Sequence, residues 1–392
     1  MKPVKKNLYL AVEAGASNTR FLLFSCAEGD PGVDGRKKSA PTFKGELRVI
    51  RQSSFEGFNY SVSGLEGLRD VLVRLNRVVS EALESDLALK GDLKEYNLTV
   101  GFAAAGIGRR GVRERFVEDF KQIRNEWRGE GCVFAGFSGS RFFFIHDGES
   151  ALWSVFPNGV GVVVNAGTGS IAFARNELGS TARSGGWGHI VGDEGSAYWI
   201  AVRALSLLLK VYDGRVVFEE EGRITPEGVK PVSSAILKRL ILERLGIGSV
   251  EEIVDWVHGG SVRGGRRDEK VRISERLGGR KAEIASLARF VTQAAKEGDS
   301  MAAGILREAG RELYLLAKSV IQRVSFDGEP RVRMVGSVFS NDRIVRESFS
   351  ALLAGDYPRA DIALSDTRPE MGVVNYLVNR VKSGEQADFE WN

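Results

Sequence analysis

The chain of 392 residues is long enough for two hydrophobic cores, and its composition, 43% apolar and 27% charged, is that of a globular protein. The formal net charge of +4 is too small for an extended nucleic-acid surface, because the basic residues are interleaved with acids or glycine. No apolar run approaches the ~20 residues that span a bilayer. No cleavage-site pattern follows the basic N-terminal residues, so we expect a cytoplasmic protein with no membrane partner.

The two cysteines, Cys26 and Cys132, lie far apart in the sequence. Neither has a second cysteine or a histidine at the spacing of a zinc or iron–sulfur site. We therefore expect two free thiols in a reducing compartment.

The first part of the chain alternates apolar runs with glycine turns and one long amphipathic helix. Apolar residues recur at helical spacing over residues 65–84, which predicts a helix there. The other predicted elements are strands at 8–12, 21–25, 47–52, 97–103 and 142–145, and helices at 112–127 and 151–156. Residues 28–46 carry Gly, Pro and charge and are expected to form a loose hairpin or loop.

The second part of the chain repeats this design, because it also opens with a strand, a Gly/Ser/Thr turn and a second strand. The predicted strands are 161–165, 171–175, 331–335 and 361–364, and the predicted helices are 197–211, 233–245, 249–257, 282–297, 301–324 and 372–382. Residues 263–280 are charged and glycine-rich and are expected to form a mobile loop. Strands separated by helices indicate α/β domains with ligands near the carboxyl ends of strands.

Two turns between apolar strands, 13–19 (EAGASNT) and 165–170 (NAGTGS), have the character of anion sites. Small residues let backbone N–H groups converge on an anion, and the hydroxyl groups add donors. The first turn lacks the Walker pattern and, taken alone, is equally well explained as a plain hairpin turn. The pair together favours phosphate binding, because two such turns can hold a polyphosphate from both sides.

Asp147 stands at the end of a predicted strand and just before a predicted helix. A carboxylate at this place can accept the proton of an attacking hydroxyl or face a magnesium ion. Taken alone, the position favours an N-cap instead. We interpret His146 beside it as a structural neighbour, because adjacent strand residues point to opposite faces.

Residues 185–199 (GGWGHIVGDEGSAYW) are rich in glycine and have no periodicity. Ordering so many glycines costs conformational entropy that a bound ligand can offset. Trp187 and Asp193 are suited to hold a sugar ring and its hydroxyl groups, although Asp193 could instead cap the helix that follows. We expect His189 to brace the loop. The later turn 334–339 (MVGSVF) would let a nucleotide base approach the backbone, or is a common turn.

These motifs together resemble the phosphate 1, phosphate 2 and adenosine motifs of the sugar kinase/actin/heat-shock ATPase superfamily. The run 184–200 is similar to the N-acetylglucosamine kinase family, in the BadF/BadG-type branch. The resemblance implies two ribonuclease-H-like (actin-like ATPase) α/β domains with ATP in an interdomain cleft. Residues 1–145 would form the first domain and 146–371 the second, with a C-terminal helix at about 372–392 packing on the first.

The resemblance also implies roles for individual residues. Asp147 would be the catalytic base for the sugar 6-hydroxyl and would face Mg²⁺, on which Glu13 would act through water. The positions that match a sugar site are Asn59, Ser170, Gly186, Trp187, Gly188 and Asp193. The positions that match an ATP site are Gly15, Ser17, Asn18, Thr19, Gly167, Thr168, Gly169, Gly336 and Ser337. Ala14 and Ala16 replace glycines of the family, which predicts a looser first turn.

The implied activity is phosphoryl transfer from ATP to the 6-hydroxyl of a hexosamine, with N-acetylglucosamine as the favoured acceptor and a homodimer as the expected assembly. A glucosamine or broad hexose kinase and a sugar-sensing regulator without kinase activity are the alternatives. Related ATPases drive electron transfer through a cysteine-held cluster, which Cys26 and Cys132 do not provide.

Overall fold

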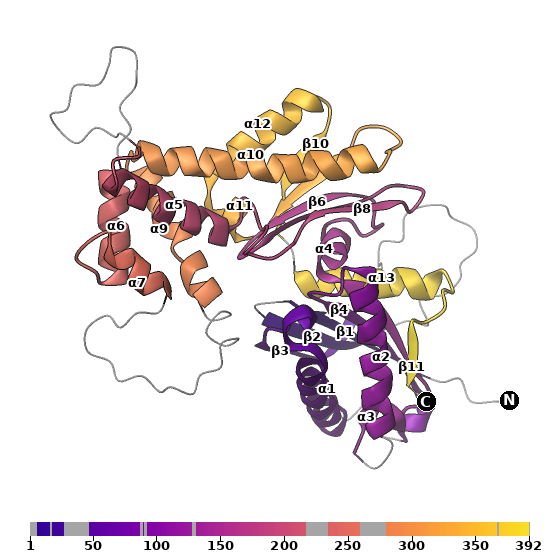
Figure 1. Ribbon diagram of the computed structural model, residues 1–392. Helices are drawn as coiled ribbons and strands as arrows, with labels where there is room; N and C mark the ends of the chain where they lie inside the picture. Colours follow the sequence, from indigo (N-terminus) through magenta and orange to yellow (C-terminus); the bar gives the residue numbers. More distant parts are fainter. Residues whose placement is uncertain are drawn as a thin grey trace, which may run out of the picture. The chain divides into compact units, whose positions relative to one another are not determined.

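The computed structural model describes residues 6–15, 18–26, 47–86, 89, 92–127, 131–216, 234–258, 280–366 and 368–391. The chain forms two compact units, one of Met1–Gly161 with Asp366–Asn392 and one of Val162–Ser365. Each unit contains one β-sheet with helices packed on it (Figure 1). Within the described ranges, no helix is long and apolar enough to cross a membrane.

The first unit is built on a six-stranded mixed sheet with the strand order β11-β5-β4-β1-β2-β3. Strands β1, β4 and β5 run parallel, whereas β2 pairs antiparallel with both β1 and β3. The strands are β1 (Lys6–Ala14), β2 (Asn18–Cys26), β3 (Leu47–Glu56), β4 (Tyr96–Ala104), β5 (Ser140–His146) and β11 (Phe389–Trp391).

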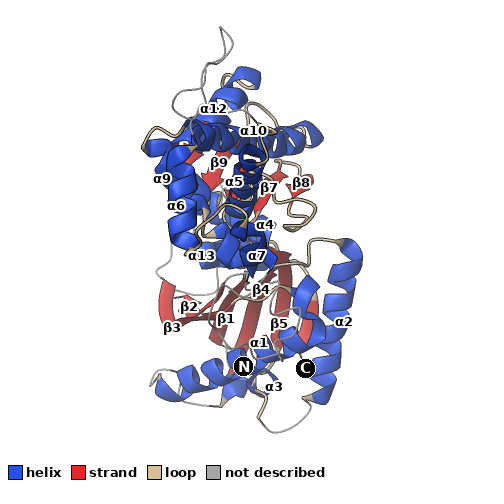
Figure 2. Ribbon diagram, turned by 60° about the vertical axis from the view of Figure 1, so that its left-hand side comes forward, coloured by secondary structure: helices blue, strands red, loops and turns tan. Residues whose placement is uncertain are grey.

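Alternation along the strands gives this sheet two apolar faces. Leu8, Leu10 and Val12 of β1 face the core that α1, α2 and α3 cover, and Tyr9 and Ala11 face the core that α4 and α13 cover. Figure 2 shows α1 and α3 on one side of this red sheet and α13 on the other. The helices are α1 (Tyr60–Ser85), α2 (Arg110–Glu126), α3 (Val133–Gly136), α4 (Asp147–Val155), α13 (Pro369–Lys382) and the 3₁₀ turn Leu93–Glu95.

The contact between α4 and α13 sets the limit of the first unit. A Cβ on Gly372 of α13 would collide with the carbonyl oxygen of Ser150 in α4, so only glycine permits this close approach. Both helices therefore lie in the first unit, whose first segment ends at Gly161. The domain boundary expected after residue 145 would instead fall before α4.

The second unit is built on a five-stranded sheet with the order β10-β9-β6-β7-β8. Strand β9 runs parallel to β6 and β10, and β7 pairs antiparallel with β8. The strands are β6 (Gly161–Ala166), β7 (Ser170–Arg175), β8 (Thr181–Gly185), β9 (Arg331–Val335) and β10 (Asp361–Leu364).

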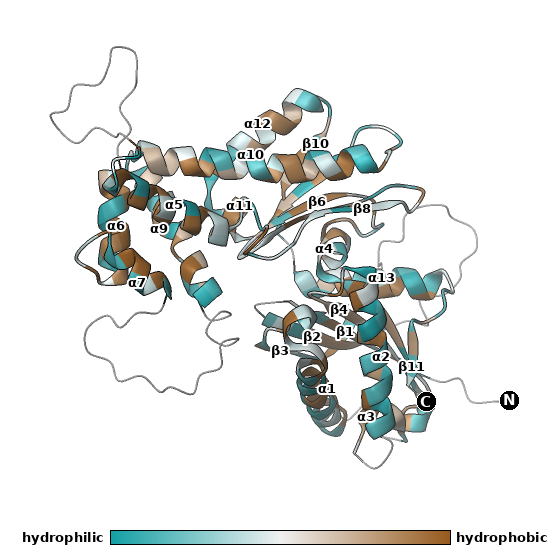
Figure 3. Ribbon diagram, viewed as in Figure 1, coloured by the Kyte–Doolittle hydropathy of each residue, from teal (hydrophilic) through white to brown (hydrophobic). Residues whose placement is uncertain are grey.

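The long helix α10 organises the core of the second unit. It buries Ile305, Leu313 and Val320 in an apolar cluster shared with the sheet and the neighbouring helices. Brown and teal segments alternate along α10 in Figure 3, as expected of a helix with one buried face. The helices of this unit are α5 (Ala197–Tyr212), α6 (Ala235–Leu245), α7 (Glu252–His258), α9 (Ala288–Lys296), α10 (Ser300–Arg323), α11 (Ser337–Asn341) and α12 (Arg343–Asp356).

The α/β fold and the repeated strand–turn–strand opening of each half are confirmed, because β1 is joined to β2 and β6 to β7 by short turns between neighbouring strands. Helix α12 was not predicted, since it buries only Val345, Phe349 and Leu353 among charged and small residues. Strands β8 and β11 were also not predicted. Residues 28–46 and all but the last of 263–280 lie outside the described residues.

The close packing of α10 on α12 gives a stability prediction. A Cβ on Gly310 would lie 2.7 Å from the Val345 carbonyl oxygen and from Ser348 Cβ, whereas a Cβ on Gly304 of the same helix meets nothing within 4 Å. We expect Gly310→Ala to destabilise the second unit by about 1–3 kcal/mol through overpacking. Gly304→Ala should stabilise it by about 0.5–1 kcal/mol through helix propensity.

Urea unfolding followed by far-ultraviolet circular dichroism measures both variants under the same conditions. Equal shifts of the unfolding midpoint for Gly304→Ala and Gly310→Ala would contradict the described contact of α10 with α12.

Candidate active site

In the first unit, the residues predicted to act on the substrates gather at one edge of the sheet. Strands β1, β4 and β5 run parallel and in register to their ends at Ala14, Ala104 and His146. Asp147 follows the last of these, and Asn59 forms a parallel bridge with the residue after β4. The carboxyl ends of parallel strands are the usual place for ligands in such a sheet.

The first glycine turn is tight at the residues that the structure describes. The Gly15 N–H donates to the Asn18 carbonyl (3.0 Å), and the Gly15 carbonyl accepts from the Phe58 N–H (2.9 Å). A Cβ on Gly15 would lie 2.9 Å from Glu13 Oε1, so a side chain here would displace that carboxylate. The present position of the Glu13 carboxylate therefore depends on glycine here.

The same turn contains four other residues, two alanines and two with hydroxyl groups. Ser17 and Ala16 lie outside the described residues. The methyl group of Ala14 is buried in the core, so it does not widen the turn. The Thr19 hydroxyl is enclosed and makes no hydrogen bond to any described residue. The conformation therefore offers no accessible Thr19 hydroxyl to a phosphate, and only the backbone of Thr19 could contribute.

Glu13 is a buried carboxylate with one ionic partner. Its Oε2 lies 3.2 Å from Nη1 of Arg20, the residue opposite it on β2. Burial is the main cause that raises the pKa of Glu13 to about 7; the negative charges of Asp147 and Glu370 act in the same direction, and Arg20 opposes them. A divalent cation nearby would favour the charged form of Glu13.

The described residues contain no group of three or more metal-ligating side chains close enough to hold an ion. Mg²⁺ commonly keeps several waters and binds through one or two carboxylates and the phosphates of a substrate. Glu13 and Asp147 interact electrostatically at the same edge and fit this second mode. The residues present therefore fit a magnesium ion that arrives with a nucleotide.

Asp147 is the first residue of α4 and its side chain is 45% exposed. The N-cap is His146, whose Nδ1 accepts from the N–H groups of Gly148 (3.0 Å) and Glu149 (3.4 Å). The alternative interpretation of Asp147 as the N-cap is therefore wrong, and His146 has the structural role. The Asp147 carboxylate accepts only from the adjacent Gly148 N–H among the described residues, so it is open to an external hydroxyl.

Asn59 caps α1, and its position is fixed by the backbone around it. Its Oδ1 accepts from the Ser61 N–H at 3.1 Å. Gly106 has φ +88°, and a Cβ there would collide with the same Oδ1. The amide of Asn59 is thus held at the edge of the sheet by its carbonyl side, with no hydrogen bond from its NH₂ group to a described residue.

In the second unit, the turn between β6 and β7 is closed and tied to a helix. The Gly167 N–H donates to the Gly169 carbonyl, and the Gly167 carbonyl accepts from the Ala197 N–H at the start of α5, both at 2.9 Å. A Cβ on Gly167 would meet nothing, whereas a Cβ on Gly169 would lie 2.8 Å from the Asp193 carboxylate. Thr168 between them is half-buried. The open side of this turn is therefore at Gly167 and Thr168.

Asp193 links this turn to the glycine-rich loop. It is 4% exposed, its Oδ1 accepts from the Ser170 N–H (3.4 Å), and its Oδ2 pairs with Lys281 Nζ (3.0 Å). Its φ of +61° is the one positive value at a non-glycine residue in the described chain. Such a backbone costs about 1–3 kcal/mol and persists where the surroundings require it.

The alternative role of Asp193 as a helix cap is wrong. Ser196 is the N-cap of α5, and its Oγ accepts from the Trp199 N–H at 3.2 Å. The Ser170 hydroxyl donates to the Glu194 carbonyl at 2.7 Å, so it also holds the loop. The backbone N–H of Ser170 therefore supports Asp193, and the Ser170 hydroxyl group supports the neighbouring Glu194.

The loop presents an aromatic ring to solvent. Trp187 is 59% exposed, and the Arg183 guanidinium lies over its ring at 4.7 Å. Gly186 and Gly188 on either side have φ of +68° and +90°, which glycine adopts without strain. An exposed indole face held by glycines is suited to the apolar face of a sugar.

His189 belongs to the same loop and packs against the start of α5. Its ring packs edge-on against Tyr198, with the centroids 4.9 Å apart. Burial and the Lys281 charge lower the pKa of His189, and Asp193 partly opposes this. A neutral packed imidazole fits the expected structural role.

In the second unit, the predicted adenosine turn at 334–339 lies next to the predicted phosphate turn at 165–170. Gly336 has φ +98° and leads into α11, which begins at Ser337. A Cβ on Gly336 would collide with the carbonyl oxygen of Ala166, the last residue of β6. Glycine at this place lets the predicted adenosine turn lie directly against the predicted phosphate turn.

Two residues of these sites were not predicted. Lys281 pairs with Asp193 from a position 88 residues away in the sequence, and its charged surroundings give no periodic signal. Arg20 pairs with Glu13, and the antiparallel register of β1 and β2 could have identified it.

Two mixed sheets, each opened by a strand, a glycine turn and an antiparallel strand, define the actin-like ATPase fold. A solved structure from Chromobacterium violaceum, provisionally named an N-acetylglucosamine kinase, supports this fold with a TM-score of 0.60 at 20% identity, covering 96% of this chain and all of that one. The model of the BadF/BadG/BcrA/BcrD ATPase family matches residues 14–365. The chain belongs to this family.

The curated relatives are sugar kinases. The chain is 31% identical over 301 residues to the N-acetylmuramic acid/N-acetylglucosamine kinase of Clostridium acetobutylicum, covering 76% of this chain and 83% of that one. It is 29% identical over 224 residues to the N-acetyl-D-glucosamine kinase of Dictyostelium discoideum, covering 57% and 60%.

The raised pKa of Glu13 gives a pH-dependent prediction. The value is about 7 in the folded chain against 4.5 for an ordinary glutamate, so between these values the folded state holds a proton that the unfolded state has lost. The free energy of unfolding therefore falls as the pH rises through this window, by about 3 kcal/mol in all. Glu13→Gln removes this titration. As the pH rises through the window, the free energy of unfolding of the variant should therefore rise relative to that of wild type by about 3 kcal/mol.

Urea unfolding between pH 5 and pH 8, without nucleotide or magnesium, measures the difference. Glu56→Gln, at the exposed end of β3, is the matched control and should follow the wild-type profile. Parallel profiles for Glu13→Gln and wild type would show that the Glu13 pKa is not raised.

Proposed function

We propose that the protein transfers the γ-phosphoryl group of ATP to the 6-hydroxyl of an amino sugar, with N-acetylglucosamine as the preferred acceptor. The observation that carries the proposal is the edge of the first sheet, where the open carboxylate of Asp147 follows β5 and the Gly15 turn follows β1, the two parallel strands on either side of β4. A proton acceptor beside an anion-binding turn is what transfer to a hydroxyl requires. Membership of an ATPase family whose curated relatives are amino-sugar kinases supports it.

Asp147 would position the sugar hydroxyl and take its proton as the new bond forms. The backbone of Gly15, Asn18 and Thr19 and of 167–169 would hold phosphate oxygens, with Ser17 as a further candidate. When bound, MgATP supplies the phosphoryl group and a cation that spreads its charge, and Glu13 would face that cation through water. Most of the rate would then come from positioning and electrostatics.

The sugar contacts are assigned by the same proposal. Asn59 would donate from its NH₂ group to a sugar hydroxyl, and Trp187 would stack its exposed ring on the sugar. Asp193 would accept from a hydroxyl through the carboxylate oxygen that Ser170 and Lys281 engage least. Gly186 and Gly188 would keep the loop close to the ring, and Gly336 with Ser337 would border the adenine. A cytoplasmic homodimer belongs to the proposal on the resemblance alone.

A panel of acceptors tests the substrate. ADP release would be measured with N-acetylglucosamine, N-acetylmuramic acid, N-acetylmannosamine, glucosamine and glucose at matched concentrations. We expect kcat/KM for N-acetylglucosamine to exceed that for glucose by roughly 10-fold or more, because a site built to bond the acetamido group leaves polar groups unpaired without it. Equal values would favour a broad hexose kinase, and no ADP with any sugar would favour a non-catalytic sensor.

Asp147→Asn tests the assigned base. We expect kcat to fall ~10²-fold or more while sugar binding, measured by calorimetry, persists, because only proton transfer is lost. Glu149→Gln is the matched control, since it removes the same charge from the same turn of α4. Near-normal kcat in Asp147→Asn, or an equal loss in Glu149→Gln, would sink the assignment.

A further inference from the structure

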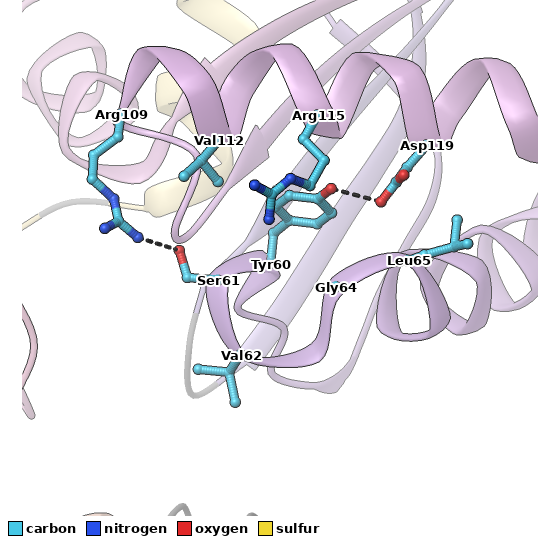
Figure 4. Close-up of a pocket in the computed structure, with 9 residues that line it drawn as sticks. All are labelled: Tyr60, Ser61, Val62, Gly64, Leu65, Arg109, Val112, Arg115 and Asp119. Atoms are coloured by element: carbon cyan, nitrogen blue, oxygen red, sulfur yellow. Dashed lines mark hydrogen bonds between the residues drawn. The ribbon is translucent and has the colours of Figure 1, made fainter.

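A cavity of about 390 Å³ opens between the start of α1 and the start of α2 in the first unit (Figure 4). It is lined by none of the residues proposed to bind sugar or nucleotide. Its one carboxylate, that of Asp119, already accepts from the Tyr60 hydroxyl at 2.6 Å, as the dashed line in Figure 4 shows. Further contacts for a nucleotide are therefore to be sought beside the glycine turns and not in this cavity.

The turn between β6 and β7 in the second unit leaves backbone donors open. The N–H groups of Thr168 and Gly169 donate to no described residue, whereas the Gly167 N–H is used within the turn. Successive backbone N–H groups in a turn form a concavity that binds an anion. The turn has no basic residue of its own, since residues 165–170 read NAGTGS.

A lysine stands one oxygen atom away from this turn. A Cβ on Gly169 would lie 2.8 Å from Asp193 Oδ2, and the same oxygen lies 3.0 Å from Lys281 Nζ. The fold therefore brings to the turn the positive charge that residues 165–170 lack.

Asp193 uses only part of the hydrogen-bonding capacity of Lys281. An ammonium group has three N–H donors, and the bond to Asp193 is the one hydrogen bond of Lys281 among the described residues. The Lys281 side chain is 25% exposed, so water or a ligand can reach it. At least one donor is therefore open to a second acceptor.

The charge of Lys281 also extends beyond its partner. Burial and then the Lys281 charge lower the pKa of His189, and the opposing effect of Asp193 is smaller than that of Lys281. At His189 the ion pair therefore acts as a net positive charge. A field of this sign favours an anion bound close to the pair.

We propose that Lys281 binds a phosphate oxygen of the nucleotide at the turn of residues 165–170, while Asp193 keeps the lysine in place. The site would consist of the Thr168 and Gly169 N–H groups and the Lys281 ammonium. The flexible four-carbon stem of lysine lets the ammonium reach from Asp193 toward the turn. The inference rests on the proposed kinase function and adds a charged ligand for the phosphate groups.

Calorimetry with AMPPNP, a non-hydrolysable analogue of ATP, and with adenosine, which has no phosphate, tests the contact in the absence of sugar. Lys281→Met should weaken AMPPNP binding roughly 10-fold or more, because a charge-assisted hydrogen bond is lost, and should leave adenosine binding unchanged. Lys281→Arg keeps the charge and should retain most of the affinity. Lys318→Met is the matched control, because it removes a lysine that pairs with Asp356 (2.7 Å) where α10 meets α12, and it should bind AMPPNP like wild type.

Asp193→Asn distinguishes a phosphate ligand from a purely structural ion pair. Asparagine tolerates the positive φ of this position, and the variant leaves Lys281 without its counter-charge. AMPPNP should therefore bind at least as tightly as to wild type, whereas a structural pair predicts the same loss in both variants. Equal losses in Asp193→Asn and Lys281→Met, or unchanged AMPPNP binding in Lys281→Met, would overturn the proposal.

The outcomes also separate the Lys281 contact from the proposed function. If wild type binds AMPPNP but phosphorylates no sugar, the transfer proposal fails and the variants still decide on Lys281. If sugars are phosphorylated and Lys281→Met has the wild-type affinity for AMPPNP, only the Lys281 contact is refuted. A wild type that binds no AMPPNP would refute both.

Discussion

The burial of one carboxylate, that of Asp193, constrains the second unit more than any other interaction at its site. A buried charge needs a partner and hydrogen bonds, and Asp193 has the Lys281 ammonium and the Ser170 N–H. To reach both, its backbone takes a positive φ, and Gly169 must lack a side chain. The predicted phosphate turn at 165–170 and the glycine-rich loop at 185–199 are therefore coupled, and a change in either displaces the other.

The buried carboxylate of the first unit, that of Glu13, has fewer compensating partners than Asp193 has. Glu13 has a single partner, Arg20, and lies near two further negative charges, so its pKa is raised to about 7. The folded chain holds this charge at a cost in stability, which a cation bound with the nucleotide would offset. The Lys281 ammonium neutralises the Asp193 carboxylate, which is therefore a fixed support. The protonation of Glu13, in contrast, can change when a cation binds nearby.

The features that the sequence predicts well are those written in consecutive residues. The glycine turns and their flanking strands follow from small residues between apolar runs, and both lie where expected. The N-cap of α4 is misread because capping depends on the backbone angles of His146, which place the helix start one residue earlier than an Asp147 cap would. The pairing of Lys281 with Asp193 depends on residues brought together by the fold, and no local pattern carries that information.

The candidate residues of the first unit stand on two kinds of element, strand ends and a helix start. Asp147 and the Gly15 turn stand on strand ends, whose positions the whole sheet fixes. Asn59 stands instead at the start of α1, which Gly64 interrupts after its first turn. Side chains of this helix can change without moving a strand, so a sheet edge suited to phosphoryl transfer can serve sugars with different substituents. For that reason the neighbours of Asn59, and not the residues at the catalytic edge, are where amino-sugar kinases of this fold should differ in the acceptors they take.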